Sequence, residues 1–166
     1  MLPLEDSLAS IFTALGQAAQ LHQAGGGTGY SFARLRPRGD VVASTGGAAS
    51  GPVSFLTVFN TAASVLAQGG RRRAASMAVL DVSHPDIGEF IDAKQAGSLE
   101  YFNLSVAVTS RFMRAVTRAG RHRLVNPRTG RVTATVGTAE LFGRICAAAW
   151  AGGDPGPAVH RPDQPG

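Results

Sequence analysis

The sequence is poor in the residues that build covalent or metal-centred frameworks. Its 166 residues include one cysteine, Cys146, which excludes an internal disulfide framework and a zinc cluster built on cysteines. No apolar run approaches the roughly 18 residues that a membrane-spanning helix needs. The first residues contain Glu5 and Asp6 where a signal peptide would carry basic residues, so we expect a cytoplasmic protein.

Lysine is almost missing as well. One Lys and 15 Arg stand against 11 acidic residues, which leaves a net charge of +5. A basic chain favours a partner with phosphates, a nucleic acid or another anionic surface. The same excess of arginine, together with abundant alanine and glycine, is also typical of GC-rich coding. Composition therefore leaves both interpretations open, although 44% apolar residues indicate a globular chain.

Helical and extended patterns alternate along the chain. Apolar spacing predicts helices at about residues 7–23, 52–68, 84–93, 110–120 and 138–151. Strands are expected at 30–35, 75–82 and 101–108, and residues 124–132 carry the turn signals of a β-hairpin. This order predicts an α/β fold with mostly parallel strands. Residues 154–166 hold four of the nine prolines without periodicity, so we expect this tail to be disordered.

Three loops could bind an anion. The first, Gly25 to Gly29, joins a helix to a strand, and its glycines would let backbone N–H groups approach an oxyanion. The same glycines also suit a helix C-cap with a tight turn. The other two loops carry arginines, at positions 71–73 and at positions 34, 36 and 38. Each could form an anion site or a solvated basic turn, and spacing alone leaves both readings open.

Residues for acid–base or metal chemistry do not stand out. Asp86 and Glu89 fall in the first turns of a predicted helix, where the helix dipole accounts for acidic residues. Cys146 has helical spacing from Leu141 and Ala149, which predicts a buried core thiol rather than a nucleophile. The four histidines show no metal-ligand spacing. We therefore predict no metal site.

Taken in order, several stretches resemble the catalytic chain of ribonucleotide reductase, and within that family the adenosylcobalamin-dependent (class II) branch. The likeness covers about residues 2–156 and rests on the following segments: Gly25-Gly-Gly-Thr-Gly-Tyr-Ser-Phe-Ala-Arg-Leu-Arg-Pro-Arg-Gly-Asp40, Ser44-Thr-Gly-Gly-Ala-Ala-Ser-Gly-Pro-Val53, Gln68-Gly-Gly-Arg-Arg-Arg73, His84-Pro-Asp-Ile87 and Phe102-Asn-Leu-Ser-Val-Ala-Val108.

The resemblance implies a ten-stranded α/β barrel made of two half-barrels, with residues 1–153 supplying most of the first half. Members of the family are oxidoreductases that reduce the ribose 2′-carbon of ribonucleotides for DNA synthesis. They do so through a cysteine thiyl radical, with a cysteine pair as reductant. In the branch that this chain resembles, the cofactor is adenosylcobalamin.

The resemblance also assigns binding residues. The ribonucleotide substrate would lie against Gly25, Gly26, Gly27, Arg72 and Ala75. An allosteric effector, a dNTP or ATP, would be bound by Asp6, Ser7, Arg36, Arg38, Ser44, Arg71 and Arg73. Residues 36–50 and 69–77 resemble the two specificity loops of the family. The helices at 7–23 and 52–68 would pack against their copies in a homodimer.

Departures from the family pattern limit what this chain is expected to do. One reducing cysteine should lie upstream of Leu2, and the radical-bearing cysteine beyond residue 166. Cys146 matches neither position, so we expect no catalytic residue here and an inactive isolated chain. Ala74 stands where the family has glycine, which predicts a stiffer second loop. Codons for residues 161–165 can encode Asp-Arg-Ile-Asn one base later, which predicts a frameshift near Pro157.

Other functions stay open at this point. A fragment encoded downstream could supply the missing half and restore a split reductase. Alternatively, the chain could be a free-standing dNTP-binding regulatory module. Nucleic-acid binding is less favoured, because no aromatic residues alternate with the arginines, and no membrane partner is expected.

Overall fold

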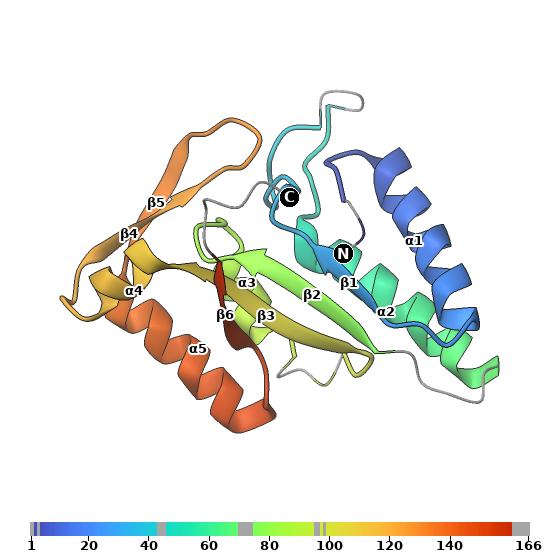
Figure 1. Cartoon of the computed structure of the whole chain (residues 1–166). Helices are drawn as coiled ribbons and strands as arrows, with labels where there is room; N and C mark the ends of the chain where they lie inside the picture. The colour runs from blue at the N-terminus through green and yellow to red at the C-terminus, as the bar shows by residue number, and fades with distance from the viewer. Residues whose placement is uncertain are drawn as a thin grey trace.

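Four parallel strands form the central sheet of the computed structural model, which describes residue 2 and residues 4–42, 46–69, 75–94, 97 and 99–160. The strands are hydrogen-bonded in the order β1 (Thr28–Ser31), β2 (Ser76–Asp81), β3 (Phe102–Thr109) and β6 (Gly156–His160) (Figure 1). Thr28 is in register with Ser76, and Ser76 with Phe102. The amino ends of β1, β2 and β3 therefore share one edge of the sheet.

Helices flank the two ends of this sheet. Helices α1 (Leu8–Gln23) and α2 (Pro52–Gly69) contact each other and lie at the β1 end. Helix α5 (Thr138–Gly152) contacts β6, α3 (Ile87–Asp92) and α4 (Ser110–Val116). A separate antiparallel hairpin consists of β4 (Arg121–Val125) and β5 (Val132–Gly137) (Figure 1). The alternation of helices and strands and the hairpin are thus confirmed.

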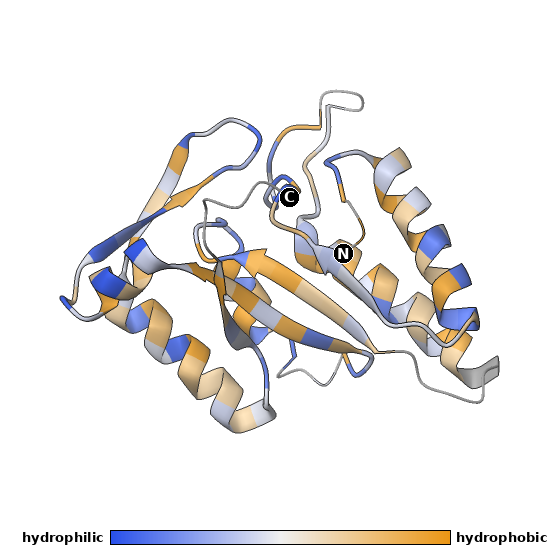
Figure 2. Ribbon diagram, in the orientation of Figure 1, coloured by the Kyte–Doolittle hydropathy of each residue, from blue (hydrophilic) through white to orange (hydrophobic). Residues whose placement is uncertain are grey.

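The core lies between the sheet and its helices. Strands β2 and β3 are apolar along most of their length (Figure 2). Their buried residues alternate along β2, so one face of the sheet forms the core, whereas side chains on the other face, such as Met77, are partly exposed. Tyr30, Phe59 and Phe102 meet there, with the rings of Tyr30 and Phe59 4.9 Å apart in an edge-to-face arrangement. Within the described residues the sheet stays open, which agrees with part of a barrel.

The expected strand at 30–35 begins and ends earlier, at Thr28 and Ser31. The N–H of Phe32 still reaches the carbonyl of Val79, but the chain then turns, with the N–H of Leu35 donating to the carbonyl of Phe32. The turn takes the following arginines out of the sheet and towards the start of α1. Pairing with β2 therefore determines where β1 ends. Residue type alone placed this end too late in the chain.

Part of the tail expected to be disordered forms strand β6. Residues 156–160 pair in parallel with residues 105–109 of β3. An edge strand tolerates proline, so Pro157 can lie opposite Val106 although it lacks an N–H group. The expectation was wrong for this segment because backbone pairing, and not apolar periodicity, orders it. Residues 161–166 lie outside the described part of the chain. The frameshift near Pro157 stays a prediction that sequencing of the coding DNA tests.

One side-chain expectation on the helices was wrong. Cys146 is exposed, whereas its neighbour Ile145 is fully buried together with Ala148. One residue along a helix turns a side chain by about 100°, which takes Cys146 off the buried face. In α2, the buried face includes Leu56, Phe59 and Ala63, whereas Val58 and Leu66 are partly exposed, at 40% and 37%. Among the described residues, no helix is long and apolar enough to cross a membrane.

Candidate functional site

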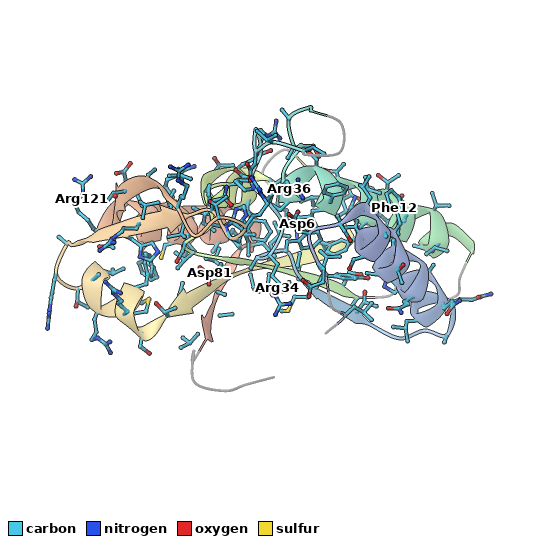
Figure 3. The ribbon with its side chains drawn as sticks, turned by 90° about the horizontal axis from the view of Figure 1, so that it is seen from above. Asp6, Phe12, Arg34, Arg36, Asp81 and Arg121 are labelled. Atoms are coloured by element: carbon cyan, nitrogen blue, oxygen red, sulfur yellow. The ribbon has the colours of Figure 1, made fainter. Side chains whose placement is uncertain are left out.

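Asp6 and Arg36 form an ion pair where α1 begins (Figure 3). Arg36 Nε donates to Asp6 Oδ2 at 2.8 Å, and the backbone N–H of Arg36 donates to Asp6 Oδ1 at 3.1 Å. Ser7 is the N-cap of α1, since its Oγ accepts the N–H of Ser10. Both side chains of the pair are about three-quarters buried, with exposed fractions of 24% for Asp6 and 23% for Arg36. The two predicted effector residues are therefore brought together.

Arg38 is held by helix α3 and the residues before it. Its backbone N–H donates to Asp86 Oδ2 at 2.8 Å, and its guanidinium forms an ion pair with Glu89. Gly51, where the same loop ends, has a φ of +83° and lies against both Arg38 and Asp86. In the sequence, the helix dipole was sufficient to explain Asp86 and Glu89. In the structure, both residues also anchor a predicted binding loop. We refer to residues 36–51 as the arginine loop.

The buried histidine His84 contacts both Leu35, just before the arginine loop, and Asp86, which anchors the loop. Its Nε2 donates to the carbonyl of Leu35 at 2.9 Å, and its Nδ1 accepts the N–H of Asp86 at 3.0 Å. A carbonyl can only accept and an N–H can only donate, so the ring is the neutral Nε2–H tautomer. Burial lowers the pKa of His84. The sequence indicated only that His84 lies near the start of a helix, because its partner Leu35 lies far away along the chain.

The glycine segment begins as a helix cap. The N–H of Gly25 donates to the carbonyl of His22, and that of Gly26 to the carbonyl of Leu21, while Gly25 has a φ of +82°. These are the two hydrogen bonds of a Schellman motif at the end of α1. Of the two readings left open by the sequence, the C-cap is confirmed for Gly25 and Gly26. Contact with a nucleotide stays a prediction for both.

Gly27 and Ala75 lie next to each other at the amino edge of the sheet. A β-carbon at Gly27 would be 3.0 Å from the carbonyl oxygen of Ala75, which accepts the N–H of Thr28. Two residues predicted to contact the substrate are thus neighbours. They lie at the amino end of β1, whereas Arg36 and Arg38 follow its carboxyl end. The two predicted sets therefore occupy opposite ends of this strand.

A polar cluster beside Gly27 was missed by sequence reasoning. His22 Nε2 lies 2.8 Å from Thr28 Oγ1 and 3.2 Å from Ser76 Oγ, and the Tyr30 hydroxyl donates to Thr28 Oγ1. Burial lowers the pKa of His22. The cluster joins the end of α1 to the first residues of β1 and β2. No local pattern could reveal it, since its members come from three separate elements.

Several predicted residues cannot be placed. Ser44, Arg71, Arg72 and Arg73 lie outside the described residues. A recess between α1 and α2 is lined by Leu15, His22, Tyr30 and Leu66, among others, and has room for about one water molecule. The recess therefore does not fit a nucleotide. The described residues also contain no cluster of histidine, cysteine and acidic side chains that could hold a metal ion.

Comparison with known proteins identifies a family for most of the chain. A family model described as "Ribonucleotide reductase, barrel domain" matches residues 1–157. The chain is 65% identical over 158 residues to a vitamin B12-dependent ribonucleoside-diphosphate reductase of Mycobacterium tuberculosis (strain CDC 1551 / Oshkosh), covering 94% of this chain and 23% of that protein. The protein of the same name from Thermoplasma acidophilum is 45% identical, with coverages of 94% and 21%.

A more distant relative is the ribonucleoside-diphosphate reductase large chain of Neurospora crassa. It is 32% identical over 129 residues, covering 74% of this chain and 14% of that protein. The chain spans less than a quarter of the length of these curated relatives. The family match nevertheless extends over almost all of the residues that the structure describes, so this chain belongs to the ribonucleotide reductase family and represents part of its barrel domain.

Proposed function

We propose that this chain provides nucleotide-binding loops of a vitamin B12-dependent ribonucleotide reductase. The observation that supports this most directly is the Asp6–Arg36 pair beside the arginine loop. A carboxylate can accept a hydrogen bond from a ribose hydroxyl, and a guanidinium can pair with phosphate oxygens. The two groups together match the neighbouring ribose and phosphate parts of a nucleotide. We assign the effector, a dNTP or ATP, to this pair, with Ser7, Arg38, Ser44, Arg71 and Arg73 as further contacts.

We place the ribonucleotide substrate at the other end of β1. Gly27 and Ala75 lie in close contact there, and the only side chain of the two is the methyl group of Ala75, which leaves room for a ligand. Gly25, Gly26 and Arg72 complete the proposed contacts. Residues 69–77 would carry information from effector to substrate, as the family resemblance implies.

The cofactor of the relatives is given in their names as vitamin B12. A corrinoid is far larger than the water-sized recess between α1 and α2. We therefore propose nucleotide binding for this chain without assigning it a cobalamin contact. Its cysteine, Cys146, lies exposed on α5 and matches no catalytic position, so the chain alone is expected to be catalytically inactive.

A homodimer through α1 and α2 is part of this proposal. Leu8, Phe12 and Val65 are apolar and more than half exposed on these helices (Figure 3 labels Phe12). Burying such side chains against a second copy would be favourable. Analytical ultracentrifugation of Phe12→Glu beside the unchanged chain tests it, with loss of the dimer expected.

A cytoplasmic location stays a prediction from the acidic start of the chain.

Equilibrium binding of dATP, dGTP, dTTP and ATP tests the effector site. Arg36→Ala and Asp6→Asn should weaken binding of at least one of them by about 10-fold or more, since a charge-assisted contact is lost. Arg34→Ala and Glu5→Gln are matched controls, because this neighbouring ion pair is largely exposed. Equal effects of both pairs of variants would contradict the assignment.

Catalysis is tested separately. The purified chain is assayed with ribonucleotides, adenosylcobalamin and a dithiol, with and without a polypeptide that supplies the rest of the barrel. We expect deoxyribonucleotides only in the second case. Turnover by the 166-residue chain alone would contradict the proposal that it lacks the catalytic thiols.

A further inference from the structure

The tip of the β4–β5 hairpin is hydrogen-bonded to the arginine loop at Asp40. Arg128 Nη2 donates to Asp40 Oδ1 at 2.7 Å, and Arg128 Nε donates to Asp40 Oδ2 at 3.0 Å. The side-chain amide of Asn126 also donates to Asp40 Oδ2, at 3.0 Å. This fork-shaped contact joins residues 88 positions apart. The Asp40 side chain is 12% exposed and the Arg128 side chain 41%, so it is the two-point geometry on a largely buried carboxylate that distinguishes this contact from the exposed ion pairs that contribute little.

Asp40 is also the residue at which the two arms of the arginine loop meet. Its carbonyl accepts the N–H of Ala49 at 2.8 Å, and the carbonyl of Ala49 accepts the N–H of Gly39. Asp40 Oδ1 further accepts the N–H of Val41 at 2.8 Å. Holding the Asp40 carboxylate in place therefore holds the described backbone of the loop on both sides.

From Asp40 the hydrogen bonds continue to the proposed effector residues. The carbonyl of Val41 accepts Arg36 Nη1 at 3.1 Å, and Arg36 is paired with Asp6. A continuous series of polar contacts thus runs from Arg128 through Asp40, Val41 and Arg36 to Asp6.

The hairpin tip is rigid enough to act as a support. Asn126 is buried, and its Oδ1 accepts the N–H of Arg128 at 2.9 Å and that of Thr129 at 3.3 Å. Its backbone N–H donates to the carbonyl of Arg131 across the turn. At the end of β4, the N–H of Val125 donates to the carbonyl of Ser83, just after β2. The tip is therefore fixed both within itself and to the central sheet.

Electrostatics keep this contact intact at neutral pH. Hydrogen bonds from the Arg128 guanidinium and the Asn126 amide hold the pKa of the Asp40 carboxyl well below its usual range. The carboxylate therefore stays charged under any condition in which the nucleotide is also fully ionised.

We infer that Arg128, supported by Asn126, is a positioning residue for the nucleotide site. It fixes Asp40 and thereby the arginine loop, so that Arg36 is presented to the ligand in one orientation. This role rests on the proposed function in so far as the loop binds a nucleotide. It makes the hairpin, to which the sequence assigned no binding residue, part of the binding machinery.

The test compares three variants of the full chain: Arg128→Ala, Arg128→Lys and the control Arg123→Ala. Arg123 is an exposed arginine on β4 of the same hairpin. The first readout is amide hydrogen exchange at Val42 and Ala49, whose N–H groups are hydrogen-bonded within the loop, relative to core amides of β3. We expect about 10-fold faster exchange in Arg128→Ala, an intermediate rate in Arg128→Lys and no change in Arg123→Ala.

The second readout is dNTP affinity, measured also in the Arg36→Ala background. Arg128→Ala should weaken binding by about 3- to 10-fold when Arg36 is present and have no further effect when it is absent. A general loss of structure would not show this dependence on Arg36. Loop exchange equal to that of Arg123→Ala would overturn the inference, even if nucleotides bind. If the unchanged chain binds no dNTP, the proposed function fails, while the exchange experiment still decides whether Arg128 holds the loop.

Discussion

Gly51 faces the carboxylate of Asp86 so closely that a β-carbon at position 51 would lie 2.7 Å from Asp86 Oδ2. The same β-carbon would be 3.0 Å from the backbone nitrogen of Arg38, which donates to that oxygen. No side chain fits between these groups. The glycine is therefore required both by its left-handed backbone and by the contact that closes the arginine loop.

Gly51→Ala should consequently destabilise the chain more than a glycine substitution that meets only backbone strain. Gly39 provides that control, because its φ is +81° and a β-carbon added there would have no neighbour within 4 Å. Gly39→Ala should cost about 1–2 kcal/mol of unfolding free energy, and Gly51→Ala at least about 1 kcal/mol more. Urea denaturation of both variants measures the difference. Equal midpoints would show that Asp86 moves aside at no cost.

Stability should fall as the pH drops below neutrality, because burial lowers the pKa of His22, His84 and His122. A histidine held neutral in the folded chain binds protons more readily when unfolded. Its contribution is complete above the unfolded pKa of about 6.5 and is lost as the pH falls towards the lower folded pKa. Asp40, whose pKa is also lowered, acts in a separate, more acidic range below about 4.

His84 is the most buried of these histidines, so the pH effect should depend on it. Urea midpoints of His84→Gln and of the unchanged chain between pH 5 and 7 measure this. The variant should be less stable at pH 7, but its stability should decrease less steeply with acid, by up to ~1.4 kcal/mol per pH unit. Parallel curves would mean that His84 is already protonated in the folded chain or titrates normally.

Thr138 should matter through its hydroxyl group. Its side chain is fully buried, and the single hydrogen of Oγ1 is shared between the carbonyl oxygens of Ala115 and Gly120, which lie 3.0 and 2.9 Å from it. Thr138→Val keeps the shape and removes the donor, which should cost about 1–2 kcal/mol. Thr135→Val on β5, where the threonine is exposed, is the matched control and should change stability by less than about 0.5 kcal/mol. Thermal or urea unfolding distinguishes them.

Cys146 should react with a thiol reagent in the folded chain, because its side chain is exposed. The rate with Ellman's reagent should lie within about threefold of the rate in the urea-unfolded chain. Moving the thiol one position, in the double variant Ile145→Cys and Cys146→Ser, should slow the reaction strongly, since Ile145 is fully buried. A slow reaction of Cys146 in the folded chain would instead support the buried position that apolar spacing predicted.

Periodic elements were the part of this fold that could be predicted from local pattern. The helices α1 and α5 and the alternation of Phe102, Leu104 and Val106 along β3 follow from residue spacing that burial requires. Strand β6 could not be found in this way, because it is short, contains Pro157 and is ordered only by pairing with β3. Spacing also could not choose between neighbouring positions such as Ile145 and Cys146.

The candidate site likewise contains residues that could be assigned from the sequence and residues that could not. Asp6 and Arg36 were assigned through family resemblance, and the structure places them in contact. His22 and Arg128 carried no signal, because their partners Ser76 and Asp40 lie 54 and 88 positions away in the chain. Contacts of this kind depend on tertiary structure, and neither residue type nor local spacing encodes them.

The Schellman cap at Gly25 and Gly26 changes how the triple-glycine string should be interpreted in other proteins. Both residues are needed to end α1, and Gly27 is needed to pass beneath the carbonyl of Ala75. Selection on the backbone alone would preserve the string after all affinity for nucleotides had been lost. A search for this string would consequently retrieve chains that share a helix-to-strand corner, whether or not they share a ligand.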